Sequence, residues 1–250
     1  MVFLDNDVRV EPGWLEQLVA TAEQEQADVV VPLLLEDNGS GQMHQLHSAG
    51  LRLKQTTLED GRCCLQQSQR RYCWPESGAE PRCMVVRGIE SHCFLMRATL
   101  LEDIQFDPLL DEPLGELDLN LQLQQQARRL VMEPAAQATF LNPQLDPSFE
   151  PMDLPLYCFR WGDRALQETC AYLIRKWNLC AHSSGLEHIR RQAIAHRQLP
   201  LYRTATAPWK LLLKGSKLSG CPLWLRSCLE SHLHRKPIRL APAATPDYHC

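Results

Sequence analysis

The chain opens on the stretch VFLDND, residues 2–7, in which a short apolar run stops at Asp5 and Asp7. An apolar run bounded by a polar turn is typical of a buried β-strand. Two carboxylates separated by one residue can both point into a cleft where the chain leaves the alternating geometry of a strand. Because ligands bind at the carboxyl ends of strands in open α/β sheets, we expect both aspartates at a binding edge.

An aspartate pair alone leaves two interpretations open. Oxygen ligands of this kind suit Mg²⁺ or Mn²⁺, but aspartates in a solvated turn that cap the next element are common as well. The next residues, EPGWL from position 11 to 15, turn the chain, and apolar side chains then recur at helical spacing up to Ala22. The sequence therefore predicts a strand, a loop and a helix in succession.

Further elements follow from apolar runs and helix-forming residues. The sequence predicts buried strands at 29–35, 84–86, 92–97 and 130–132, with Pro32 at an edge or bulge and Pro134 ending the last strand. Leucines alternate over 117–123 as in a strand, but the helix formers around them favour a helix over 115–129. The polar stretch 42–82 is expected to hold loops and short strands, and helices are expected at 157–161, 165–177 and 187–196.

Charge divides the chain into two parts. Residues 1–150 hold 24 acidic and 11 basic side chains, whereas residues 151–250 hold 6 acidic and 15 basic ones. An acidic part suits divalent-metal chemistry, and a basic part suits an anionic substrate or a membrane surface. We therefore expect an α/β unit over 1–150 and a basic, helical extension over 151–250.

Several classes of protein are disfavoured. No apolar stretch reaches the length of a membrane-spanning helix, and no secretory leader is readable, so a cytoplasmic location is expected. The eleven cysteines are scattered without a CxxC pair, which favours free thiols over structural zinc. Segment 209–236 mixes tryptophan and leucine with basic residues and would suit peripheral contact with the inner face of a membrane, although a packed helical pair is the simpler interpretation. No nucleic-acid partner is expected.

The order of these motifs resembles family-two glycosyltransferases, which have the GT-A fold, over about residues 1–180. A buried strand with Asp-x-Asp precedes a Pro-Gly-Trp-Leu helix start, and HSAG at 47–50, FD at 106–107 and GELDL at 115–119 follow in the family's order. A strand with a proline comes next, and YLIRKW at 172–177 is similar to the end of many members. The resemblance implies a partial, Rossmann-like mixed sheet flanked by helices, without the β/α units that precede this point in the family.

The resemblance also implies roles for individual residues. Asp5 would lie near the ribose or diphosphate of a nucleotide-diphosphate sugar, and Asp7 would ligate Mg²⁺ or Mn²⁺, with Asp5 beside it. Glu116, where the family more often has aspartate, would be the general base, with Asp118 two residues further on. The alternative for both is an acidic helix N-terminus that favours the dipole. Phe140 stands where a metal-binding histidine often follows in the family.

The implied function is transfer of a sugar, with inversion, from a nucleotide-diphosphate sugar to a glycan or lipid-linked acceptor. Two other classes stay open on the residues alone. One is an inactive remnant or binding module that lacks the nucleotide-binding half of the fold. The other is a membrane-surface adaptor that uses segment 209–236.

Overall fold

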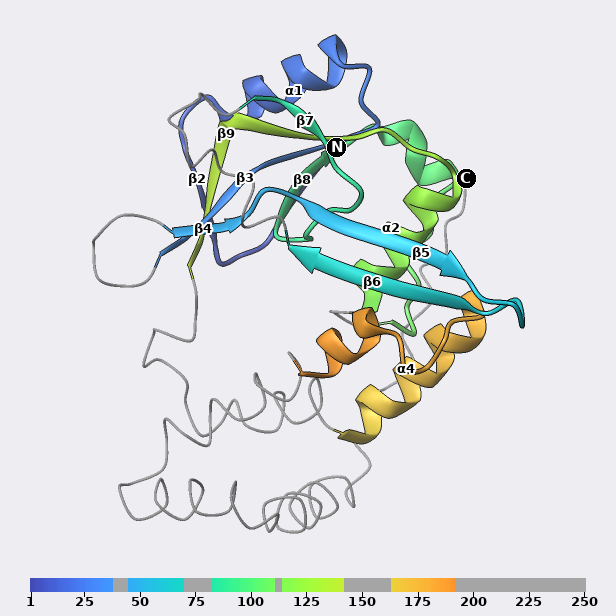
Figure 1. Ribbon diagram of the computed structural model, residues 1–250. Helices are drawn as coiled ribbons and strands as arrows, with labels where there is room; N and C mark the ends of the chain where they lie inside the picture. The colour runs from blue at the N-terminus through green and yellow to red at the C-terminus, as the bar shows by residue number, and fades with distance from the viewer. Residues whose placement is uncertain (38–44, 70–81, 111–113, 142–162, 192–250) are drawn as a thin grey trace, which may run out of the picture.

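A computed structural model describes residues 1–37, 45–69, 82–110, 114–141 and 163–191 (Figure 1). Its elements in chain order are β1 (Val2–Leu4), β2 (Val8–Val10), α1 (Trp14–Gln24), β3 (Val29–Asp37), β4 (Gln45–Ser48), β5 (Leu51–Thr57), β6 (Cys63–Gln69), β7 (Met84–Val85), β8 (Cys93–Met96), the 3₁₀ helix η1 (Ala98–Glu102), α2 (Leu114–Gln125), β9 (Leu130–Leu141) and α4 (Asp163–Trp177). The expected mixed α/β sheet flanked by helices is confirmed.

The main sheet has seven strands in the described part of the chain. Its order is β1-β8-β3-β9-β2, with β4 added to β3 and β7 added to β9. Only β3 and β9 run parallel, and every other pair is antiparallel. Because β1 runs antiparallel to β8 with Leu4 opposite Cys93, the end of β1 and the start of β8 meet at one edge of the sheet.

Two prolines meet at a single irregularity in the centre of this sheet. Pro32 pairs with Glu133, but the next residue of β3 pairs with Gln137, so three residues of β9 bulge outward. The prediction of a bulge at Pro32 is confirmed. The prediction that Pro134 ends its strand is wrong. Pro134 lies in the bulge, so the N–H that proline lacks is not needed for pairing with β3. The N–H of Ala135, also in the bulge, donates to the Glu133 carboxylate at 2.8 Å.

Side chains alternate between the two faces of the sheet. Val30 of β3, with Leu95 and Val131 beside it, packs under Leu18 of α1. Val29 and Val31, on either side of Val30, face the other way. They form a core cluster with Leu33, Phe94, Met96 and Met132 of the sheet and with Leu119 and Leu123 of α2. Strands covered on both faces read as continuous apolar runs, which is why β3 was recognisable in the sequence.

A second layer lies beyond α2. The β5–β6 hairpin and α4 pack against the far side of α2, and Figure 1 shows both on the side of the sheet opposite α1. Leu65, Leu117, Leu121 and Leu173 are fully buried in this cluster. Helix α2 is therefore covered on two sides, by the sheet and by the hairpin with α4, so its leucines are buried all round. This explains why its sequence lacks a clear one-sided pattern.

Some predictions fall outside the described residues. The expected helix at 157–161 and the segment 209–236 do, and the boundary at residue 150 stays a prediction. Helix α4 agrees with the helix expected at 165–177, and residues 184–191 are helical where the next helix was expected. No described helix is both long and apolar enough to cross a membrane.

Candidate diphosphate and metal site

The turn after β1 places Asp5 and Asp7 close to His92, a residue far from them in the sequence. The backbone N–H of Asp5 donates to the His92 carbonyl at 3.0 Å, and the His92 Nδ1 lies 3.0 Å from the Asp5 Oδ2. Asp5, Asp7 and His92 each offer one ligand atom, and these three atoms all lie within 4.8 Å of one another. The strand register thus assembles a three-ligand cluster from residues 87 positions apart.

The surroundings of His92 set its charge. Burial alone would lower the pKa of His92, but the hydrogen bond with Asp5 and the negative charges of Glu90 and Glu116 raise this pKa to about 9. Without a metal, the ring is therefore an imidazolium that balances the carboxylates. Its flat side stacks on Phe140, with the ring centroids 4.4 Å apart.

A second histidine, His47 of β4, lies beside this ring. His47, the first residue of the HSAG motif, lies with its Nδ1 3.2 Å from Glu36 and its Nε2 3.6 Å from Glu90. Burial opposes a charge on His47, but both carboxylates favour it, and the net effect raises the pKa of His47. Its ring meets the edge of the His92 ring at 5.6 Å. The motif therefore places a buried histidine with a raised pKa beside the cluster.

Glu116 reaches the same edge from the first turn of α2. Its Oε2 accepts hydrogen bonds from the Ser91 backbone N–H at 2.9 Å and from the Ser91 hydroxyl at 3.1 Å. One turn further on, the buried Asn120 holds the same loop. Its Oδ1 accepts the Ile89 N–H at 2.8 Å, and its Nδ2 donates to the Ile89 carbonyl at 2.9 Å. Helix α2 thus holds the loop that carries His92, and it places the Glu116 carboxylate next to the cluster.

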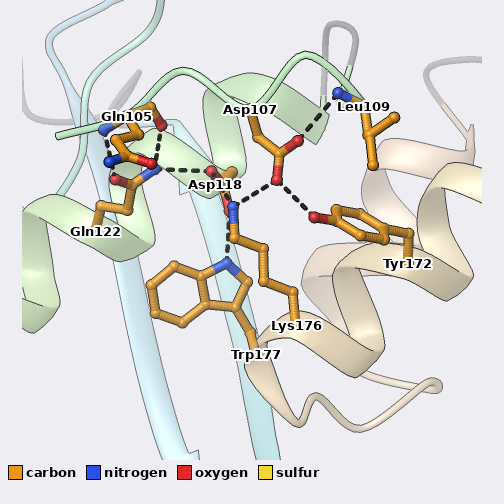
Figure 2. Close-up of polar contacts among 8 residues, drawn as sticks. All are labelled: Gln105, Asp107, Leu109, Asp118, Gln122, Tyr172, Lys176 and Trp177. Carbon is orange, nitrogen blue, oxygen red and sulfur yellow. Dashed lines mark hydrogen bonds and ion pairs between the residues drawn. The ribbon is translucent and has the colours of Figure 1, made fainter.

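Asp118 points elsewhere. It is 1% exposed, and its carboxylate accepts the Trp177 indole N–H at 2.6 Å and the Gln122 amide at 2.8 Å (Figure 2). The Lys176 ammonium lies 2.9 Å from its Oδ1. Asp118 therefore anchors the end of α4 to α2, with its oxygens directed into that contact.

Asp107 belongs to the same anchor. Its Oδ2 accepts hydrogen bonds from the Lys176 ammonium and the Tyr172 hydroxyl, both at 2.8 Å (Figure 2). The hydrogen bond from Lys176, helped by the Leu109 backbone N–H, lowers the pKa of Asp107 to about 2. Two motifs singled out in the sequence, FD at 106–107 and YLIRKW at 172–177, thus bind each other.

Sequence reasoning missed two residues of the site. His92 directly precedes the buried strand β8. Asp5 follows β1, which was expected to be buried but is a half-exposed strand at the edge of the sheet. Only the antiparallel register of β1 and β8 makes the two residues neighbours. His47 was noticed as part of a motif, without its pairing to Glu36 and Glu90. Phe140 was expected to leave a gap among the metal ligands, and the structure instead brings in His92, which stacks on the Phe140 ring.

The cluster suits a divalent ion. Two carboxylates and one imidazole match Mn²⁺, which accepts oxygen and nitrogen ligands, and Mg²⁺ would draw chiefly on the carboxylates. Ligation by His92 would require loss of its proton. A cavity of about 810 Å³ lies elsewhere, between β5, β7 and the end of α2, and it shares no residue with the cluster.

Comparison with known proteins finds a family whose model matches the part of the chain that carries this cluster. The family described as glycosyl transferase family 2 matches residues 1–104. Among solved structures, the chain is similar to "GalNAc-T7 with UDP, GalNAc and Mn2+", with 16% sequence identity and a TM-score of 0.41, a likeness too distant to inform on ligands. It covers 77% of this chain and 37% of that one. No curated protein matches. The matched segment includes Asp5, Asp7, His47 and His92, so over residues 1–104 the chain is similar to glycosyl transferase family 2.

Proposed function

We propose that the chain is part of a metal-dependent, inverting glycosyltransferase that uses a nucleotide-diphosphate sugar. The observation that carries the proposal is the meeting of Asp5, Asp7 and His92 at the edge of the sheet, within the family-two segment and with Glu116 beside them. The acceptor in this proposal is a glycan or lipid-linked hydroxyl. Location at the cytoplasmic side of a membrane belongs to the same proposal.

The three ligands would bind the diphosphate end of the donor. A bound Mg²⁺ or Mn²⁺ would supply positive charge to the departing nucleotide diphosphate. Asp7 would hold the ion, and Asp5, fixed through its backbone N–H on His92, would orient the ribose or diphosphate. The buried imidazole of His47 lies beside this group, and its raised pKa favours the positively charged form that would stabilise a diphosphate.

Glu116 would remove the proton from the acceptor hydroxyl as that oxygen attacks the anomeric carbon. Its orientation is fixed by the two hydrogen bonds from Ser91. A base on the side of the sugar opposite the leaving diphosphate gives a single displacement and therefore inversion. Asp118 has a positioning role in this proposal, because its carboxylate is buried in the contact with Trp177.

A panel of nucleotide-diphosphate sugars tests the proposal. The chain is incubated with each donor, Mn²⁺ and simple glycan acceptors, and the released nucleotide diphosphate is quantified. We expect metal-dependent release with at least one donor, loss of release in Asp7→Asn, and a product of opposite anomeric configuration by NMR. A retained configuration would contradict the single displacement.

The binding-module alternative gives a different pattern. It predicts Mn²⁺-dependent binding of a nucleotide diphosphate by the wild type without release from any donor. In that case Glu116→Gln would change nothing measurable. Release that is reduced in Glu116→Gln while nucleotide binding persists would support the enzyme and exclude the module.

A further inference from the structure

The segment that follows α4 pairs with the start of β6 in the β5–β6 hairpin through a short parallel contact. The Cys63 N–H donates to the Asn178 carbonyl at 2.8 Å, and the Cys180 N–H donates to the Cys63 carbonyl at 2.7 Å. These two bonds form a parallel bridge between Cys63 and Leu179. The backbones of the two segments are therefore held at the spacing of neighbouring strands.

This register places Cys64 directly beside Cys180. In a parallel pair, the residues that follow a bridge lie opposite each other, and their side chains point to the same face. Strand spacing of about 4.8 Å falls within the range of about 4.4–6.8 Å between Cα atoms that a disulfide spans. The two thiols also share a hydrogen bond. The neighbouring Cys63 points the other way, with its thiol 3.5 Å from the Gln55 amide oxygen.

The two thiols differ in reactivity. The backbone N–H of His182, the Cys64 thiol and the Arg62 guanidinium lower the pKa of Cys180. The hydrogen bond with Cys180 and partial burial raise the pKa of Cys64. Cys180 is therefore the thiolate that attacks first, and Cys64 is the thiol that resolves the product. Both are only half-buried, unlike Cys93 and Cys170, whose thiols are buried.

We propose that Cys64 and Cys180 form a reversible disulfide that ties the hairpin to the end of α4. With glutathione disulfide as oxidant, the Cys180 thiolate attacks one sulfur and releases one glutathione thiolate. The Cys64 thiolate then attacks the Cys180 sulfur of the mixed disulfide and releases the second. Two protein thiols are oxidised, one glutathione disulfide is reduced to two thiols, and the two protons from the cysteines pass to the released glutathione or to water.

The bond would act on the anchor of α4. Only two residues separate Cys180 from Trp177, whose indole holds Asp118 on α2. A covalent tie at Cys180 restricts the opening of that contact in the oxidised chain, and reduction releases the restriction. This inference does not depend on sugar transfer, since the thiols lie on the hairpin and on the segment after α4, and neither belongs to the aspartate cluster.

The test uses the full chain in glutathione buffers of graded potential, followed by alkylation, digestion without reductant and mass spectrometry. We expect one linked peptide pair joining residues 64 and 180, lighter by the two hydrogens lost and cleaved by dithiothreitol. Because Cys63 and Cys64 share a peptide, Cys63→Ser identifies the partner: the link persists in this variant and is lost in Cys64→Ser. In Cys64→Ser, Cys180 should instead accumulate as a mixed disulfide with glutathione.

Three outcomes would overturn the inference. One is that both thiols stay fully alkylated in wild type under conditions that oxidise the glutathione pool. Another is that Cys180 links to a different cysteine. The third is that Cys63→Ser abolishes the link while its far-UV circular dichroism matches wild type. Alkylation rates of the reduced wild type give a check without any variant, because Cys180 should react faster than Cys93 and Cys170.

Discussion

Replacing Trp177 by phenylalanine should weaken the contact between α4 and α2. The indole N–H donates to the Asp118 Oδ1 at 2.6 Å, and Asp118 is 1% exposed, so water cannot take over the lost hydrogen bond. A hydrogen bond to a buried charged group contributes about 1.5–3 kcal/mol. Phenylalanine keeps most of the apolar contact of Trp177, so this hydrogen bond is the main loss.

Trp14→Phe provides a matched control. Trp14 is also half-buried and packs between α1 and the sheet, but the described residues give its indole nitrogen no hydrogen-bond partner. We therefore expect Trp177→Phe to lose about 1.5–3 kcal/mol more than Trp14→Phe. With a slope of about 3 kcal/mol per molar urea for a chain of this size, the unfolding midpoints should differ by about 0.5–1 M.

A double-mutant cycle assigns the loss to the pair. Combining Trp177→Phe with Asp118→Asn should give a coupling energy between about 0.5 and 3 kcal/mol, measured by urea unfolding with circular dichroism. Equal midpoints for the two tryptophan variants, or additive effects in the cycle, would refute the assignment of Asp118 to this anchor.

Three other predictions follow from named contacts. Glu116→Gln should lower sugar transfer by about 10²–10⁴-fold, with Mn²⁺ binding unchanged in a titration. The carboxylate of Asp107 is favoured by folding, because its pKa is held at about 2, so its stabilisation is complete above about pH 4 and disappears toward pH 2. Urea unfolding at several pH values should show a shallower acid loss in Asp107→Asn than in wild type. Gly50→Ala should cost about 2–4 kcal/mol, from a φ of 86° and a new Cβ 2.5 Å from the Val86 Cγ1. Gly61→Ala, with a φ of 79° and open space, should cost only about 1 kcal/mol in the same experiment.

The elements of the fold with continuous apolar runs could be read from the sequence. Strand β3, covered on both faces, and helix α1 were predicted with nearly the observed bounds, whereas the short strand β2 between β1 and α1 was expected to be a loop. The strand β9 was cut short at Pro134, because a local rule about proline cannot foresee that the partner strand carries a proline at the same place. The hairpin of β5 and β6 was not resolved in a polar stretch, since its burial comes from α2 and α4.

The residues of the site also divide into those that sequence motifs predicted and those that only the structure identifies. Asp5, Asp7 and Glu116 were singled out from motifs, and the structure brings them to one edge of the sheet. His92 was not predicted as a site residue, because its position beside Asp5 depends on the register between two strands about 90 residues apart in sequence. Asp118 was grouped with Glu116 by sequence distance alone, but residues two positions apart lie on roughly opposite sides of a helix, and Asp118 faces α4.

Binding of Mn²⁺, followed by electron paramagnetic resonance of the free ion, tests the central claim most directly. The account predicts saturable binding by wild type and a loss of at least about tenfold in affinity in Asp7→Ala, as expected for a removed ligand. Asp60→Ala removes an exposed aspartate that pairs with Arg62 on the hairpin, and it should bind as wild type does. Equal affinity in Asp7→Ala and wild type, or no binding by either, would contradict a metal site at the end of β1.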